Sequence, residues 1–317
     1  MAQQLINIGA SANDNTGDPL RDAFIKLNSN VTDLQLSITT SSDSSFNAIK
    51  VGKGAGNIGA NTAVGKDTLT SNTTGDSNSA FGNSALNKNN SGLGNSSFSF
   101  FSLYNNTNGN YNSSFGYQSL YNNISASNNS SFGYNSLFNN TIGAGNVSIG
   151  SRAMFSSIIL NNNTAIGNDA MYGNTLYSNC TALGNASSIT ADNQITLGNS
   201  SITSLRCNVQ TITSLSDKRD KTDIIEISEG LDFISKLKPV TFTWNQRDGG
   251  RVGIKASGFI AQDLLELQND SLIGENLDLV SDSDPEQLEA RYANLMPVMI
   301  KAIQELKKEI ELLKSTK

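Results

Sequence analysis

The sequence predicts a mostly β chain: an elongated β-solenoid shaft between an N-terminal coiled coil and a C-terminal α+β unit that ends in a long helix. Three observations predict this class. A 17-residue spacing recurs through the middle of the chain, apolar residues at heptad spacing precede it, and a second heptad pattern ends the chain. Apolar residues make up only 37% of the chain and charged residues 16%, which is typical of a repetitive architecture rather than of highly charged disorder.

The composition excludes several functions. The net charge is −6 and no basic stripe is present, so no nucleic-acid partner is expected. The chain has no run of about 20 apolar residues, so no membrane insertion is predicted. Histidine is absent, which excludes Ser-His-Asp catalysis and histidine metal sites, and no cofactor is expected. Residues 1–4 lack the basic start of a signal peptide, which predicts synthesis in the cytoplasm. Cys180 and Cys207 are expected to be buried thiols rather than a disulfide framework.

A helix is predicted to begin at Asp18-Pro19, because Asp18 can cap it and proline suits its first position. The apolar positions that follow have heptad spacing: Leu20, Phe24, Leu27, Val31, Leu34 and Ile38. This pattern favours a parallel coiled coil of identical chains over residues 18–40. A single amphipathic helix packed on a domain is the alternative. Residues 41–60 are rich in Ser, Thr and Gly and are predicted to be a linker.

The beginning of the chain contains Ile6-Asn7-Ile8-Gly9, a run from Asn13 to Arg21, and Phe24-Ile25-Lys26-Leu27-Asn28. Together these motifs resemble a segment that recurs at the N-terminus of tailed-phage fibre proteins. Asn15 departs from the family pattern, where glycine is more common. The resemblance implies that residues 1–17 attach the protein to other proteins of the virion.

Residues 61–199 contain columns of similar residues that recur every 17 positions. Glycine stands at Gly65, Gly82, Gly116, Gly133, Gly150, Gly167 and Gly184, with Ser99 in the one gap. An apolar column precedes it at Val64, Phe81, Phe98, Phe115, Phe132, Ile149, Ile166 and Leu183, and a small column before that runs from Ala63 to Ala182. Four residues after the glycine come Leu69, Leu86, Leu103, Leu120, Leu137, Met154 and Met171. An aromatic column lies beside these, at Tyr104, Tyr121, Phe138, Phe155 and Tyr172.

Disorder does not explain this registry of unlike residue types, because disorder requires composition but not position. Each repeat is predicted to form a short strand, a glycine turn, a second apolar contact and an Asn-rich loop. One repeat buries too little to be stable, so neighbouring repeats must stack. The pattern resembles the trimeric β-roll heads of bacterial adhesins and, more closely, 17-residue repeats of phage and bacterial fibre proteins. The resemblance implies a homotrimeric shaft; a monomeric solenoid remains the alternative.

Catalysis within the shaft is not expected. Between residues 61 and 190 the acids Asp67, Asp76 and Asp169 are scattered, so no carboxylate pair for glycoside cleavage is predicted. The tyrosines in the aromatic column are expected to stack on one another. Stacking on the sugars of a host surface polysaccharide is the other interpretation.

The last part of the chain begins with a neck, residues 200–215, to which the sequence assigns no structure. Residues 216–317 then read as a mixed globular unit. A short helix is predicted from Leu231, a strand at Val240–Trp244, and a strand leading into a helix at Gly258–Leu265. A second heptad seam predicts a long self-associating helix at Tyr292, Met296, Met299, Ile303, Leu306, Ile310 and Leu313.

Four motifs stand out from Ser216 onward: Ser216-Asp217-x-Arg219-x-Lys221, Lys238-Pro239-Val240, Gly258–Asp263 and Tyr292–Leu306. With them, this part of the chain resembles the endosialidase-type intramolecular chaperone domain of phage tail spikes and fibres. In that family the domain promotes trimer assembly and then cuts itself off before the motif serine. The resemblance therefore implies cleavage at Leu215–Ser216, with Ser216 as the nucleophile and Lys221 as the base.

This chemistry is physically coherent. A serine hydroxyl needs a base to take its proton, and a lysine can act as that base only when it is neutral. Arg219 and Lys218 are nearby cations that would favour the neutral form. Asp217 or Asp220 would instead pair with Lys221 and keep it charged. A polar turn without chemistry is the remaining interpretation.

Together these observations predict a tailed-phage fibre that is located on the virion and made in the host cytoplasm. Its C-terminal domain would drive homotrimer assembly and then release itself, leaving residues 1–215. A receptor-binding adhesin that keeps the C-terminal domain as a trimerising cap is the first alternative. A depolymerising spike is the second, and the scarcity of acids in the shaft disfavours it.

Overall fold

The computed structural model describes residues 26–28, 43–46, 49–208, 213–247 and 249–316. The chain divides into two compact units. The shaft unit extends through Ile189 and includes Ile195–Leu197, and the C-terminal unit comprises Thr190–Gln194 and Gly198–Lys317. The attachment segment predicted for residues 1–17 lies outside the described residues. So does most of the coiled coil predicted for residues 18–40, of which Lys26–Asn28 are described and are helical.

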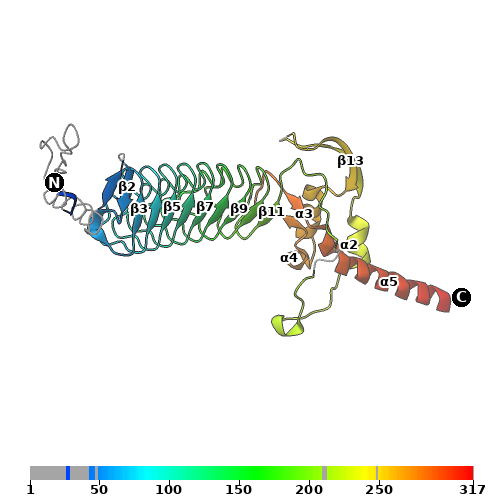
Figure 1. Cartoon of the computed structure of the whole chain (residues 1–317). Helices are drawn as coiled ribbons and strands as arrows, with labels where there is room; N and C mark the ends of the chain where they lie inside the picture. The colour runs from blue at the N-terminus through cyan, green and yellow to red at the C-terminus, as the bar shows by residue number, and fades with distance from the viewer. Residues whose placement is uncertain (1–25, 29–42, 47–48, 209–212, 248, 317) are drawn as a thin grey trace, which may run out of the picture. The chain divides into compact units, whose positions relative to one another are not determined.

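The shaft unit is a β-solenoid of about eight turns, as the 17-residue spacing predicts (Figure 1). Each turn contributes one three-residue strand to a parallel ladder in which equivalent repeat positions face one another, for example Ser114 and Ser131. The strands are β3 (Thr62–Val64), β4 (Ser79–Phe81), β5 (Ser96–Phe98), β6 (Ser113–Phe115), β7 (Ser130–Phe132), β8 (Val147–Ile149), β9 (Thr164–Ile166), β10 (Thr181–Leu183) and β11 (Ile195–Leu197).

Two of the sequence columns form the interior of the shaft. Successive strand residues point to opposite faces, so the small central residue of each strand from β3 to β10, such as Ser114, points inward and is fully buried. The leucine and methionine column fills the rest of the interior and is likewise buried, at Leu69, Leu86, Leu103, Leu120, Leu137, Met154 and Met171. Each residue of this column has a φ between 48° and 51°, the left-handed region that side chains with a Cβ seldom adopt. The repeating tight turn that brings each leucine inward therefore requires local strain.

Buried asparagines satisfy the polar backbone at the entry to each strand. Asn112 is fully buried; its backbone NH donates to Asn95 Oδ1 at 3.0 Å, and its Nδ2 donates to the carbonyl of Ala126 at 2.8 Å. Asn78, Asn95, Asn129 and Asn146 repeat the same contacts. The asparagines therefore bond to one another along the stack, and these bonds satisfy buried polar groups that would otherwise destabilise the shaft.

An antiparallel hairpin covers the N-terminal end of the parallel ladder. It consists of β1 (Ser44–Phe46) and β2 (Ile49–Gly52), and β2 runs antiparallel to β3, with Val51 opposite Val64. A 3₁₀ turn, η1 (Ala55–Asn57), follows. The sequence predicts a linker over residues 41–60, but the structure places these elements there. Short strands with Ser and Gly carry too weak an apolar pattern to be recognised; they gain their order from pairing with the solenoid.

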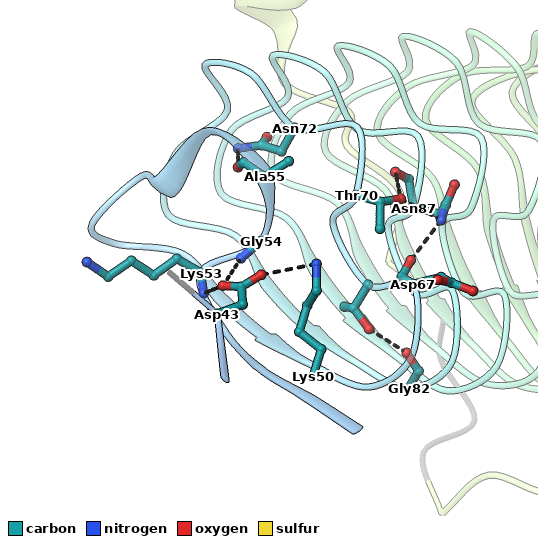
Figure 2. Close-up of polar contacts among 11 residues, drawn as sticks. Asp43, Lys50, Lys53, Gly54, Ala55, Asp67, Thr70, Asn72, Gly82 and Asn87 are labelled. Atoms are coloured by element: carbon teal, nitrogen blue, oxygen red, sulfur yellow. Dashed lines mark hydrogen bonds and ion pairs between the residues drawn. The ribbon is translucent and has the colours of Figure 1, made fainter. Parts of the chain in front are cut away.

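Asp43 holds this hairpin together (Figure 2). Its Oδ1 accepts from the backbone NH of Lys53 at 2.6 Å and of Gly54 at 3.0 Å, and its Oδ2 lies 3.0 Å from Lys50 Nζ. Burial alone would raise the pKa of Asp43, but the bonds from Lys50, Lys53 and Gly54 outweigh it and lower that pKa. The side chain is therefore an ionised anchor for the end cap.

The C-terminal unit is a small α+β assembly. Its helices are η2 (Lys218–Asp220), α2 (Leu231–Lys236), α3 (Ala261–Asn269), α4 (Gly274–Leu277), η3 (Tyr292–Leu295) and α5 (Met296–Ser315). Its strands form two antiparallel pairs, β12 (Val240–Asn245) with β13 (Val252–Gly258) and β14 (Val280–Ser281) with β15 (Glu289–Ala290). The predicted short helix, strand, strand-to-helix turn and long terminal helix are all present. The buried core consists of Phe233, Leu264, Leu277, Leu279, Val280, Leu295 and Val298.

A close contact joins α2 to α5. The backbone NH of Leu231 donates to Glu305 Oε2 at 2.7 Å, so a carboxylate on α5 satisfies an orphan donor at the start of α2. A Cβ at Gly230 would lie 2.8 Å from the backbone nitrogen of Ala302, so only glycine permits this approach. Val298 and Ala302 on the same side of α5 are buried.

The two cysteines have different surroundings. Cys180 is buried in the shaft, with its Sγ 3.2 Å from the carbonyl oxygen of Ser178. Cys207 is exposed, so the prediction of a buried thiol is wrong for this residue. Residues 200–208 of the predicted neck form no helix or strand and leave Ile202 and Leu205 exposed as well. Residues 200–208 thus offer no interior in which the Cys207 thiol could be buried.

Candidate functional site

The segment from Leu215 to Lys221 forms a tight turn around η2. Asp217 is the N-cap of η2, and its Oδ1 accepts from the backbone NH of Arg219 at 2.9 Å. The turn closes with the backbone NH of Lys221 donating to the carbonyl of Lys218 at 3.2 Å. The chain is thereby folded back, and the side chains at its two ends meet.

The turn brings the predicted nucleophile and base together. Lys221 Nζ donates to Ser216 Oγ at 2.5 Å. The distance is shorter than that of an ordinary hydrogen bond, so the two groups are in direct contact, as transfer of a hydroxyl proton to a base requires. The segment can therefore supply a serine hydroxyl and a lysine amine to one reacting carbonyl.

Two charged side chains beside Ser216 and Lys221 pair with each other. Asp217 forms an ion pair with Arg219, with Oδ2 2.6 Å from Nη2, and Nε of Arg219 lies 3.1 Å from Oδ1. The Arg219 guanidinium and the Arg219 backbone NH lower the pKa of Asp217, and the carboxylate in turn raises the pKa of Arg219. Of the two carboxylates that the sequence offers as partners of Lys221, Asp217 is thus held by Arg219. Within the part of the chain that the structure describes, the Asp220 carboxylate makes no ion pair.

The site is open to solvent in the single chain. Leu215 is fully exposed, and every residue from 213 to 226 is exposed. The bond before Ser216 therefore lies on the surface next to its own nucleophile. This geometry suits a cut in the chain itself, because the reacting carbonyl belongs to the residue that precedes the serine.

The shaft presents a different set of side chains. Asp169 forms an ion pair with Arg152 at 2.7 Å, and Asp67 and Asp76 belong to other parts of the solenoid. The structure thus brings no carboxylate pair together among these three acids.

The aromatic column stacks as predicted, with ring centroids 5.2–5.3 Å apart from Tyr104 through Tyr172.

Sequence reasoning missed a second, more exposed aromatic ladder. Phe100, Tyr117 and Tyr134 stack at 5.4 Å and 5.6 Å and are 36%, 42% and 51% exposed. They directly follow the glycine column at the same 17-residue spacing, so the same alignment of repeats would have found them. Sequence reasoning also missed that Asp217 pairs with Arg219, two residues away.

Neither a membrane span nor a metal centre is found among the described residues. None of the helices there is both long and apolar enough to cross a membrane. No cluster of three or more His, Cys, Asp or Glu side chains suited to a metal ion is found in those same ranges.

Comparison with family models matches residues 216–272 to the family described as the chaperone of endosialidase. The match begins at Ser216 and includes η2, α2, β12, β13 and α3. The C-terminal unit therefore contains an endosialidase-type chaperone domain, as the sequence predicts. The comparisons with curated proteins and with solved structures give no match.

Proposed function

We propose that the chain is a fibre protein of a tailed phage, assembled as a homotrimer by its C-terminal unit, which then releases itself by cutting Leu215–Ser216. The combination of a solenoid shaft with an endosialidase-type chaperone domain fits such a fibre. Residues 1–215 would be the mature shaft on the virion. Residues 1–17 would attach it to other virion proteins.

The exposed seam of α5 is the observation that carries the assembly part of this proposal. Val298 and Ala302 face the core of the unit, whereas the predicted heptad seam, which begins in η3 and continues along α5, is at least 41% exposed at every position: Tyr292, Met296, Met299, Ile303, Leu306, Ile310 and Leu313. A contiguous exposed apolar stripe at heptad spacing marks an association surface. Identical chains would cover it.

The outer face of the shaft provides a second apolar surface in line with assembly. The third residue of each strand points outward, and Phe81, Phe98, Phe115 and Phe132 stack with centroids 4.6–4.8 Å apart. The column continues through Ile149, Ile166 and Leu183, each between 36% and 40% exposed. A trimer that buries this column would remove apolar area from water along the whole shaft.

The cut follows from the geometry of the turn. Neutral Lys221 takes the hydroxyl proton of Ser216, and Oγ attacks the carbonyl carbon of Leu215. The C–N bond then breaks, and the proton passes to the departing amine. Water hydrolyses the resulting ester, leaving a carboxylate on Leu215 and a free amine and hydroxyl on Ser216. Once the chaperone has left, the shaft cannot retrace its assembly, and its stability becomes kinetic.

Intact mass of the recombinant chain tests the cut. We expect fragments that divide between Leu215 and Ser216 in the wild type, and whole chains in Ser216→Ala and Lys221→Ala. A single full-length mass in the wild type would show that the C-terminal unit stays as a permanent cap. Light scattering of uncut Ser216→Ala tests assembly: we expect a trimer, and a smaller species when Ile303→Asp is added.

A receptor-binding role for the shaft is a second candidate. It is favoured by the exposed ladder Phe100–Tyr117–Tyr134 and by Tyr111, which is 62% exposed. Aromatic rings at the surface are suited to contact the apolar faces of sugars. Binding of residues 1–215 to a glycan array, lost in Tyr111→Ala or Tyr134→Ala but kept in Tyr172→Ala, would support recognition of a host polysaccharide. Absence of binding would contradict it.

A further inference from the structure

The turn at the proposed cleavage site contains more charged side chains than the proposed cut requires. Besides Lys221, residues 216–223 include the carboxylates Asp217, Asp220 and Asp223 and the cations Lys218 and Arg219. Residues 213–226 are all exposed, so the turn is open to solvent in the single chain. The carboxylates that could compete with Ser216 for Lys221 there are those of the turn itself.

We propose that Arg219 is a positioning residue for cleavage: it holds the Asp217 carboxylate away from Lys221, so that the lysine remains bonded to Ser216. The inference rests on the self-cleavage proposed above. Arg219 itself touches neither the scissile bond nor Ser216; it acts through Asp217.

The contacts of Asp217 support this role. Oδ1 accepts from the Arg219 backbone NH at 2.9 Å and from Nε at 3.1 Å, and Oδ2 lies 2.6 Å from Nη2 and 3.2 Å from Nε. Both carboxylate oxygens are thus occupied by one arginine. The planar guanidinium can engage both at once, whereas a lysine ammonium would bind as a single point charge.

Loss of this pairing would matter because Asp217 directly follows Ser216. An unpaired carboxylate beside the nucleophile would attract the ammonium of Lys221 and favour its charged form. A charged lysine cannot accept the Ser216 proton. Arg219 therefore removes a competing partner, in addition to closing the turn through its backbone NH.

Lys218 provides a matched control within the same turn. It has the same charge as Arg219 and lies next to it, but the structure shows only its backbone carbonyl in the turn, accepting from the NH of Lys221. Removing the charge at Lys218 frees no carboxylate. Lys218→Gln and Arg219→Gln thus make equal changes in net charge with different expected effects on Lys221.

The experiment measures the rate of cleavage of the full chain against pH for wild type, Lys218→Gln, Arg219→Gln and Asp217→Asn/Arg219→Gln. We expect Arg219→Gln to move the pH profile upward, and the cut at neutral pH to become about tenfold slower for every pH unit by which the profile moves. We expect Lys218→Gln to leave the profile in place. The double variant should cut faster at neutral pH than Arg219→Gln, because asparagine keeps the N-cap but has no charge.

The outcomes separate the two proposals. A wild-type chain that remains whole overturns both. A wild type that cuts, with an Arg219→Gln profile that does not move or a double variant as slow as the single one, overturns only the role of Arg219. Each variant is also prepared with Ser216→Ala and compared by light scattering and circular dichroism. If Arg219→Gln loses assembly in that background, the residue is structural and the proposed role is wrong.

Discussion

Leu120 in the shaft and Ile303 in α5 are both aliphatic members of a periodic column, but their surroundings differ. Leu120 is fully buried between the equivalent leucines of the turns before and after it, whereas Ile303 is 60% exposed. The shaft obtains its contacts from its own chain, one repeat away. The seam of α5 is left at least 41% exposed by the described residues of the C-terminal unit.

This difference indicates how the two regions depend on assembly. Repeat stacking buries a continuous core within one chain, so each turn is stabilised by its neighbours. An apolar helix face in water gains stability only when a partner covers it, and that gain depends on concentration. An exposed apolar seam of this kind is what the proposed assembly of chains by the C-terminal unit requires.

The largest expected effect is the loss of stability in Leu120→Ala, which is compared with the loss in Ile303→Ala. Leu120→Ala should lower the free energy of unfolding by about 2–5 kcal/mol, since it empties a site in a closely packed column. Ile303→Ala should cost less than about 0.5 kcal/mol in the unassembled chain, because an exposed side chain loses little. Thermal unfolding in the Ser216→Ala background, over a wide range of protein concentration, measures both.

The concentration dependence distinguishes the two regions. The loss from Leu120→Ala should be nearly independent of concentration, and the loss from Ile303→Ala should grow as the chains assemble. Leu176→Ala, at a shaft position that is 73% exposed, is the control for leucine truncation. Equal losses at Leu120 and Leu176 would show that the column is not the core of the shaft.

A second prediction concerns the glycine column, which has no counterpart in the C-terminal unit. Gly116 has φ +138°, and an added Cβ would lie 2.4 Å from the carbonyl oxygen of Gly133. Gly116→Ala should therefore lower the unfolding free energy of the shaft by about 1–3 kcal/mol. Gly173 has nothing within 4 Å of such a Cβ, so Gly173→Ala should be nearly neutral in chemical denaturation. A neutral Gly116→Ala would contradict the stacked turns.

Much of this fold could be predicted because one rule repeats. Gly65, Gly82 and their equivalents mark a turn in each repeat, and the columns beside them indicate which residues are buried. The positive φ of Leu120 could not be predicted, since leucine rarely adopts it and only the stacked neighbours enforce it. The hairpin at residues 44–52 could not be predicted either, because its order comes from pairing with Val64 rather than from its own residues.

The sequence motif predicts the two residues of the candidate site but not the geometry that brings them together. The spacing of Ser216 and Lys221 allows contact only if the chain between them turns back, and the capped turn that does so was not foreseen. The sequence left open whether Asp217 pairs with Lys221. The structure pairs Asp217 with Arg219. Asp217 caps the turn by accepting from the backbone NH of Arg219, and this bond brings the arginine side chain close enough to bind the same carboxylate.

A third prediction concerns Ser99, the one position of the glycine column between Gly65 and Gly184 that is not a glycine. Ser99 has φ +120°, where the equivalent residues are glycines. Relief of the strain at this position exceeds the entropy that a glycine adds to the unfolded chain, so Ser99→Gly should stabilise the shaft by about 1 kcal/mol. Denaturant unfolding checks this, with Ser102→Gly as a control at a buried position of the same turn. A loss of stability in Ser99→Gly would mean that the serine is not strained.

The smallest expected effect lies at the end of the shaft, where Asp43 anchors the hairpin. Its pKa in the folded chain is below the ordinary value of 3.8, so the bonds from Lys50, Lys53 and Gly54 contribute stability above that value. The contribution is lost as the pH falls from 3.8 through the lowered folded-state pKa, because in this range the unfolded chain takes up a proton that the folded chain does not. Asp43→Asn should remove this pH dependence and cost less than about 1 kcal/mol. Protection factors from hydrogen exchange of residues 49–58 against pH measure it. We expect lower protection at low pH in the wild type and lower protection at every pH in the variant. The interior turns around Leu120 should remain protected, because the hairpin caps the solenoid without supporting its middle.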